Sequence, residues 1–300
     1  MPESDYLVKA ISKNGSFRVI AVSINNLSEE ARQRHNLSHT ATVALGRAFA
    51  CGILLCYTLK KTKGHLTLKI KGNGQIGGII VDASNEGTVR GYVDHPQIEC
   101  FDEKGYVDID KAVGKTGYVH VSYDAEKGIP HQSSSELVSG EIAKDVVNYL
   151  AISEQIPSYI SCGVYLEPHT GKVLQAGGIL IQTLPGTDDK DLKIVEETVS
   201  KIDPFSILLR SGLSLEQIIR KTLANFDIEI VSEFEGVCFH CGCSHERFES
   251  ALSSIGKEEI QEIIDQVGYA EGRCHFCNNV YLVKKEELQQ LLKKNPKKQT

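Results

Sequence analysis

The chain has 300 residues, of which 41% are hydrophobic and 24% are charged, so it carries enough apolar surface for folded domains and is not of the disordered class. Its 33 Lys and Arg residues against 39 Asp and Glu residues give a formal net charge of −6. This acidic balance argues against a nucleic-acid binder that depends on a basic surface.

The start of the chain predicts no secretory signal, because Met1–Asp5 has neither a cationic n-region nor an apolar h-region. The longest apolar run, Ala48–Tyr57, is half the length of the ~20 residues that a membrane-spanning helix needs. We therefore expect a soluble, cytoplasmic protein.

Residues 1–186 read mainly as strands. The first two, Tyr6–Ser12 and Phe17–Ile24, flank Asn14-Gly15, which is a strong signal for a type I′ hairpin turn. A turn at Pro168–Gly171 joins the last two. The further expected strands are His65–Lys71, Thr88–Val93, Gly117–Tyr123, Ser158–Leu166 and Val173–Leu184.

Two helices interrupt these strands, one over about Thr40–Leu59 and one over Glu141–Ile152 with Ser139 as its candidate N-cap. Runs of strands with few helices indicate an α+β domain built on antiparallel sheet. Pro185-Gly186 marks its end.

The segment Gly72–Gly77 matches the dinucleotide-binding pattern G-x-G-x-x-G but lacks its context. That pattern places a pyrophosphate at a helix N-terminus, so a helix must follow it. Gly78–Asp82 reads instead as a buried strand, and Tyr92 stands where an acidic residue would bind the ribose. We expect a glycine-rich hairpin connection here and no nicotinamide cofactor.

Beyond residue 186 the pattern becomes helical. A short helix is expected from Pro204 to Gly212, and Ser214–Gln217 is a capping-box signature for another. These helices are too short to be stable alone, so residues 187–230 are predicted to be a helical linker that lies on other domains. A further helix is expected before these two, with Thr187 as its candidate cap. Its apolar positions are Leu192, Val195, Val199 and Ile202.

Residues 231–300 are predicted to form a small carboxy-terminal domain. Its expected elements are a helix capped by Ser244 and ended at Gly256, a helix over Lys257–Gln266, strands over Tyr269–Arg273 and Asn279–Val283, and a last helix near Lys285–Lys293.

Cysteines cluster in this part of the chain. Five of the nine fall there, and in a reducing cytosol such a cluster is a metal or redox site rather than a disulfide framework. They are Cys238, Cys241, Cys243, Cys274 and Cys277. The other four, Cys51, Cys56, Cys100 and Cys162, lie in apolar stretches and read as small buried hydrophobic residues.

Tetrahedral zinc needs thiolates at short spacing from two separate segments. Cys274 and Cys277 form one half of such a site. The other half is either Cys238 with Cys241, as in a zinc ribbon, or Cys241 with Cys243. Further candidates are His240, His245 and His275, but an all-cysteine site needs none of them.

The metal is expected to dominate the stability of this domain. The hydrophobic core of a domain of only about 70 residues seldom contributes more than ~3–5 kcal/mol to folding, whereas structural zinc contributes an apparent ~10–16 kcal/mol. Oxidants attack thiolates, and a disulfide between Cys274 and Cys277 or between Cys241 and Cys243 would consume two ligands. Oxidation would then release the metal and unfold the domain. The spacing alone leaves a permanently folded zinc knuckle open as the alternative.

The cysteine pattern and several other segments resemble one known family. Phe239–Arg247, followed by Cys274–Cys277, is similar to the C-x-C…C-x-x-C signature of the bacterial 33-kilodalton heat shock protein family, whose members are redox-regulated holdase chaperones. Weaker similarities follow in the right order at Asp5–Ala10, Thr40-Ala41, Ala44–Arg47, Gly72–Asp82, Ser153–Ser158, Ala176–Gly178 and Leu184–Gly186.

By this resemblance, the ligands of one Zn²⁺ per chain in the reduced state are Cys241, Cys243, Cys274 and Cys277. The redox-active disulfides would be Cys241–Cys243 and Cys274–Cys277, with the second as the peroxide sensor. Cys238 departs from the family's four-cysteine pattern, which leaves it open as an alternative thiol for Cys241.

The resemblance also implies a mechanism. The reduced, zinc-bound form is inactive because the carboxy-terminal domain holds the linker against the amino-terminal domain and masks apolar surface. Under oxidative stress, disulfides form, zinc leaves, and the exposed surface binds unfolding client proteins and prevents their aggregation without ATP. A homodimer is expected in the oxidised state, and no nucleotide, nucleic-acid or membrane partner and no enzymatic activity are expected.

A thiol–disulfide oxidoreductase that uses Cys274 and Cys277 is the alternative function. Such an enzyme would carry its C-x-x-C beside a βαβ pattern, whereas this one joins two short expected strands. A zinc-dependent nucleic-acid module is a third reading, which the acidic balance disfavours.

Overall fold

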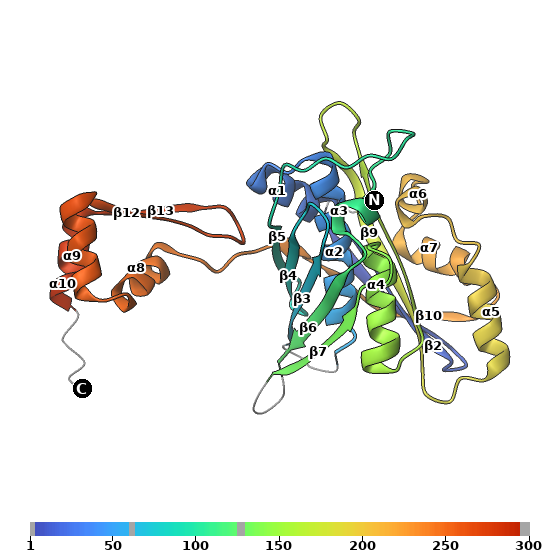
Figure 1. The fold of residues 1–300 in the computed structure, drawn as a ribbon. Coiled ribbons are helices and arrows are strands. Elements are labelled where there is room, and N and C mark those ends of the chain that lie inside the picture. Colours follow the sequence, from blue (N-terminus) through green and yellow to red (C-terminus); the bar gives the residue numbers. More distant parts are fainter. Residues whose placement is uncertain (1–3, 60–63, 125–129, 295–300) are drawn as a thin grey trace. The chain divides into compact units, whose positions relative to one another are not determined.

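A computed structural model describes residues 4–59, 64–124 and 130–294. The chain forms two compact units, Met1–His240 and Cys241–Thr300. The first contains two sheets and a long helix that packs against strands of both (Figure 1). This architecture confirms the predicted α+β class with its mainly antiparallel sheets.

The first sheet has five antiparallel strands in the order β10-β1-β2-β9-β8. Its strands are β1 (Tyr6–Ser12), β2 (Phe17–Ser23), β8 (Ser158–Leu166), β9 (Val173–Thr183) and β10 (Ile228–Glu235). In register, Tyr6 lies opposite both Ser23 and Glu235. The first strand of the chain therefore lies inside this sheet, and a strand from residue 228 onward forms its edge.

The second sheet has six strands in the order β11-β5-β4-β3-β6-β7. Its strands are β3 (His65–Gly72), β4 (Gly78–Ser84), β5 (Thr88–Val93), β6 (Gly117–Tyr123), β7 (His131–Glu136) and β11 (Cys238–Phe239). Neighbours are antiparallel except β11, which runs parallel to β5. Because β3 and β4 are paired directly, Gly72–Gly77 is a hairpin connection, as predicted.

The long helix is α2 (His39–Cys56), whose first turn is capped by the Ser38 hydroxyl accepting from the Ala41 N–H. Gly52 lets it approach the second sheet closely, since a Cβ there would lie 2.8 Å from Cγ1 of Val81. By length and composition α2 is apolar enough to cross a membrane, but 89% of that stretch is buried inside the protein. It is the core helix of the first unit.

Two predicted turn and cap assignments before residue 187 are wrong. Strands β1 and β2 are not joined by a type I′ turn, because only Gly15 has a positive φ and the Asn14 side chain accepts from the Ser16 N–H instead. Ser139 is not an N-cap: the Asp145 carboxylate accepts from the backbone N–H groups of residues 138–140, so this buried acceptor organises the loop. The helix itself, α4 (Ile142–Tyr149), continues as a π-helical turn, η1 (Leu150–Glu154). Among the described residues before 187, the remaining helices are α1 (Asn25–His35) and α3 (Ile109–Val113).

Three short helices follow, and they pack on the first sheet (Figure 1). They are α5 (Asp189–Val199), α6 (Phe205–Arg210) and α7 (Leu215–Thr222). The predicted capping box at Ser214 and Gln217 is present. The cap of α5 is Asp188 rather than Thr187, whose hydroxyl donates to the backbone carbonyls of Ser16 and Leu184. Apolar side chains of all three helices join β1, β2 and β9 in one cluster.

The second unit contains α8 (His245–Ser254), α9 (Lys257–Gln266), β12 (Tyr269–Arg273), β13 (Val280–Lys284) and α10 (Lys285–Lys294). These are the predicted elements. The six buried residues of its core are Ile260, Ile264, Ala270, Val283, Leu288 and Leu291. The division into residues 1–186, 187–230 and 231–300 stays a prediction, while residues 228–240 pack within the first unit.

The carboxylate of Asp5 gives a prediction for the pH dependence of stability. Asp5 is 3% exposed and accepts from the N–H groups of Asn26 and Leu27 at the start of α1. Burial raises its pKa to about 6, against the lowering effect of these hydrogen bonds. In the unfolded chain the pKa of Asp5 is about 3.9, so the folded state binds more protons than the unfolded state between pH 3.9 and about pH 6. The stability that the protonated Asp5 side chain contributes is therefore lost as the pH rises through about 6. The Asp5→Asn variant cannot ionise at this position. Its free energy of unfolding, relative to that of the wild type, should therefore increase by on the order of 2–3 kcal/mol from pH 4 to pH 7. Urea unfolding followed by circular dichroism checks this, and a constant difference between the two proteins across that range would contradict it.

Candidate metal centre

The first pair of cysteines lies in the loop that leads into α8. Cys241 and Cys243 are separated by Gly242, and the helix begins immediately after Ser244. The Ser244 hydroxyl accepts from the Arg247 N–H at 3.2 Å. This cap fixes where the helix begins and so holds the preceding loop.

The second pair lies in the turn between β12 and β13. The Cys274 N–H donates to the Asn279 carbonyl at 2.9 Å, and the Asn278 N–H donates to the Cys274 carbonyl at 2.8 Å. Asn278 takes the left-handed conformation, with φ of 62°, which an asparagine tolerates better than most residues. These bonds close a tight knuckle that places Cys274 and Cys277 on the same turn.

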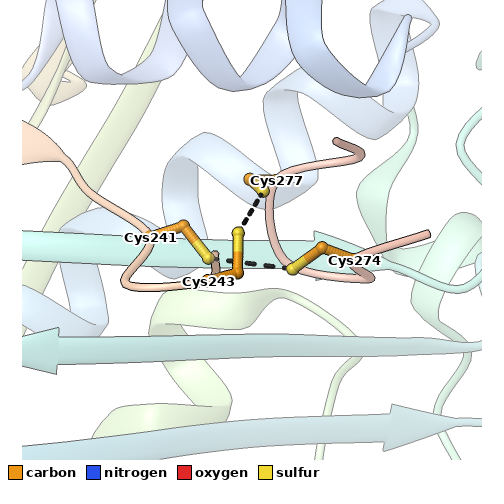
Figure 2. A group of neighbouring side chains, drawn as sticks. All are labelled: Cys241, Cys243, Cys274 and Cys277. Atoms are coloured by element: carbon orange, nitrogen blue, oxygen red, sulfur yellow. Dashed lines mark hydrogen bonds between the residues drawn. The ribbon is translucent and has the colours of Figure 1, made fainter. Parts of the chain in front are cut away.

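Figure 2 shows the four side chains pointing toward one another from these two segments. All four Sγ atoms lie within 4.8 Å of one another. The Sγ atoms of Cys241 and Cys274 are 3.7 Å apart, and those of Cys243 and Cys277 are 3.2 Å apart. A Zn–S distance of about 2.3 Å requires sulfurs roughly 3.8 Å apart in a tetrahedron, so the four thiols fit a single metal ion of that kind.

The electrostatics of the cluster favour a cation. Partial burial acts to raise the pKa of Cys243, but hydrogen bonds from Tyr281 and the other three thiols outweigh it and lower the pKa to about 7. Burial, together with the same neighbouring thiols, holds the pKa of Cys277 far above its usual value. The neighbouring groups thus favour the thiolate of Cys243 and oppose that of Cys277. A divalent cation at the centre would allow all four to ionise together.

Tyr281 is a site residue that the sequence analysis missed. Its hydroxyl donates to the Sγ of Cys243 at 2.9 Å, and its ring lies 6.2 Å from that of Phe248 on α8. It occupies β13 opposite Gly272, where Phe248 also packs. The only sequence signal was its place near the knuckle, which does not show that its hydroxyl reaches a sulfur.

The fifth cysteine of the sequence cluster lies elsewhere. Cys238 belongs to β11 in the first unit and is exposed, and it is not in the four-sulfur group. Burial of its thiol and the nearby carboxylates of Glu30 and Asp5 raise its pKa. Of the two pairings that the sequence left open, the structure brings Cys241 and Cys243 to the knuckle.

The three candidate histidines also lie outside the four-sulfur group. His240 ends the first unit, and His275 is exposed within the knuckle. His245 instead has its Nε2 atom 3.5 Å from Glu249 and 3.7 Å from Glu287. The all-cysteine arrangement is the one that the geometry supports.

The four scattered cysteines are buried as expected, with one exception. Cys51, Cys56 and Cys100 are at most 3% exposed, whereas Cys162 is only half-buried. A hydrogen bond with Cys162, together with burial, raises the pKa of Cys51 well above its usual value. Such protonated, enclosed thiols are poor nucleophiles, which fits a packing role for Cys51.

Comparison with known proteins gives one consistent result. A family model described as Hsp33 protein matches residues 5–284. The 33 kDa chaperonin of Gloeobacter violaceus is 42% identical over 96% of this chain and 95% of its own length. That of Thermosynechococcus vestitus is 40% identical over 96% and 97%. The crystal structure of the 33 kDa chaperonin, a heat shock protein 33 homologue, from Thermotoga maritima superposes with a TM-score of 0.88 at 33% identity, covering 97% of this chain and 98% of that one.

Proposed function

This chain belongs to the Hsp33 family of chaperones, and we propose that it is a redox-regulated, ATP-independent holdase. Reduced and zinc-bound, it is inactive. Oxidised and zinc-free, it binds unfolding proteins and prevents their aggregation. The observation that supports this most directly is the convergence of four sulfurs within 4.8 Å, because such a cluster is at once a metal site and a store of oxidisable thiols.

In the reduced state, Cys241, Cys243, Cys274 and Cys277 hold one Zn²⁺ per chain. The ion supplies charge neutralisation, and the chain supplies its geometry through the Ser244 cap and the knuckle. The hydroxyl of Tyr281 donates to Cys243. Such a contact orients a ligand, as groups around metal sites commonly do.

Oxidation converts the ligands into disulfides. Two thiols and one molecule of hydrogen peroxide give one disulfide and two molecules of water, so two such steps consume all four ligands. The proposed products are Cys241–Cys243 and Cys274–Cys277. The sulfur–sulfur contacts from Cys241 to Cys274 and from Cys243 to Cys277 run instead between the two segments. Peptide mapping of the oxidised protein distinguishes these pairings.

Loss of the metal would release apolar surface for clients. Among the linker helices, α5 is the least firmly held, because Val195 is its one buried residue. A half-open surface pocket of about 320 Å³ is lined by residues of α5, α6 and α7 and of the segments that follow α5 and α7, so solvent reaches this side of α5. In α6 and α7, by contrast, Phe205, Leu215 and Ile218 are fully buried. We propose that α5 detaches first and that the active form is a cytoplasmic homodimer whose partners are unfolded proteins, with no nucleotide or nucleic acid.

Treatment of the zinc-loaded protein with hypochlorous acid tests this function. Zinc release, measured with a chromogenic chelator, and suppression of the aggregation of a thermally unfolding client should rise together, from near zero in the reduced protein. Reduction in the presence of zinc should reverse both. Zinc release without any gain in suppression would leave only a structural knuckle.

The same preparation tests the oxidoreductase alternative. The Cys274–Cys277 pair joins two strands of a hairpin, whereas the low-pKa C-x-x-C cysteines of disulfide oxidoreductases are stabilised at helix N-termini. We therefore propose that the protein is not an enzyme. Sustained turnover in an insulin-reduction assay would contradict this.

A further inference from the structure

The last four residues of the first unit form a short strap along the edge of the second sheet. The strap, Val237–His240, contains β11 and ends directly before Cys241. Its Cys238 N–H donates to the Gly87 carbonyl at 3.0 Å, and its His240 N–H donates to the Val89 carbonyl at 2.8 Å. These bonds make it a parallel neighbour of β5.

The side chains of the strap alternate between buried and exposed. Val237 is 4% exposed and Phe239 is 8% exposed, while Cys238 between them is exposed. The Arg34 guanidinium of α1 lies 5.1 Å from the centre of the Phe239 ring. The edge thus receives an extended segment with two apolar side chains at alternate positions.

The strap pairs with only part of the exposed edge of β5. It pairs with Thr88 and Val89, the first two of the six residues of β5. In the part of the chain that the structure describes, β11 is the only strand on this side of β5. A pairing of two residues is weak compared with an ordinary strand, so a longer extended segment can compete with it by pairing further toward Val93.

We propose that the strap occupies the place of a client, and that the β5 edge binds extended segments of unfolded proteins with apolar residues at alternate positions. This inference rests on the proposed function. When the cysteine domain unfolds, the strap loses its ordered continuation at Cys241 and is displaced. Strand addition suits a holdase, because main-chain hydrogen bonds do not depend on sequence and alternate pockets select only for apolar character.

A labelled peptide with the sequence of Phe234–His240, in which serine replaces Cys238, tests the edge in the wild-type protein. Fluorescence anisotropy should show at least tenfold tighter binding to the oxidised, zinc-free form than to the reduced form. N-methylation of the peptide at positions 238 and 240 removes the two donors to β5 and should weaken binding at least tenfold. N-methylation at position 239 is the matched control, because the N–H groups of the strap that donate to β5 are those of residues 238 and 240.

Substitutions within the strap itself provide a second test. Phe239→Ala removes one buried anchor, so the reduced, zinc-loaded protein should bind the peptide at least tenfold more tightly than the wild type. Cys238→Ser changes an exposed position of the same strap and should leave binding unchanged. Suppression of client aggregation is measured in parallel. If the oxidised protein suppresses aggregation but binds the peptide no better than the reduced form, or binds all N-methylated peptides equally, the edge is not the binding site. If it suppresses no aggregation, the proposed function fails and the client role of the edge fails with it.

Discussion

Removing the metal from the reduced protein is expected to unfold residues 241–294 while the two sheets of the first unit stay folded. The second unit has a core of only six buried residues, and α8 contributes none of them. A core of this size supplies no more than about 3–5 kcal/mol. Structural zinc contributes an apparent folding free energy of about 10–16 kcal/mol. Loss of the ion therefore removes more stabilisation than the core of this unit supplies.

Hydrogen exchange with mass spectrometry measures this directly. After chelation, peptides from α8, α9 and α10 should lose their protection, whereas peptides from β2, β9 and α2 should keep it. Adding back Zn²⁺ under reducing conditions is the control and should restore slow exchange. Retained protection across residues 241–294, with zinc shown to be absent, would contradict the prediction and favour a knuckle that folds without its metal.

Replacing Cys243 with serine is expected to abolish stoichiometric zinc binding. Cys243 has a pKa lowered to about 7 and receives the Tyr281 hydrogen bond, so its thiolate form is favoured. A serine hydroxyl is not ionised at neutral pH and is a poor ligand for zinc in a thiolate site. Zinc content after dialysis against a chelator should fall from one ion per chain to near zero.

The matched control is Cys238→Ser. Cys238 lies in β11 and outside the four-sulfur group, so this variant should keep one zinc per chain. If Cys238→Ser loses zinc and Cys243→Ser keeps it, the ligands are those of a zinc ribbon formed by Cys238 and Cys241. If both lose it, the site draws on a fifth thiol and the four-cysteine assignment is wrong.

The sequence predicted best those elements whose ends are set by nearby residues. In the second unit, Ser244 caps α8 and Gly256, with φ of 115°, follows its end. Helix α1 was not predicted for the opposite reason. Its N-cap residue Ile24 makes no side-chain cap, and its first N–H groups are satisfied by Asp5, about 20 residues away. A cap supplied by a residue so distant in the sequence leaves no local signal.

Strand pairing over long distances was also hidden. Residues 228–235 alternate partly in polarity, but their partner is β1 at the start of the chain. Without that pairing, this strand was divided between the predicted linker, which ends at residue 230, and the predicted carboxy-terminal domain, which begins at residue 231. The polar strand β7, with only Ser135 buried, was missed because a polar edge strand resembles a loop in composition.

The thiols of the candidate metal site were easier to find than their surroundings. Cysteine spacing is a local signal, so the sequence narrowed the site to five thiols and left one choice open. The fold decides which cysteines complete the site. Cys238 pairs with β5 at a sheet edge, whereas Cys241 and Cys243 lie beside Cys274 and Cys277. The role of Tyr281 depends on the register of β12 and β13, which spacing does not encode.

The place of β10 at the edge of the first sheet has a consequence for synthesis on the ribosome. Its partner β1 emerges first, and at about 5–20 residues per second the intervening chain takes roughly 10–40 s to be made. Throughout that interval β1 presents an unpaired edge, which is a template for association with other nascent chains. Ribosomes that stall before residue 228 should therefore accumulate aggregation-prone fragments in which this edge of β1 has no partner strand.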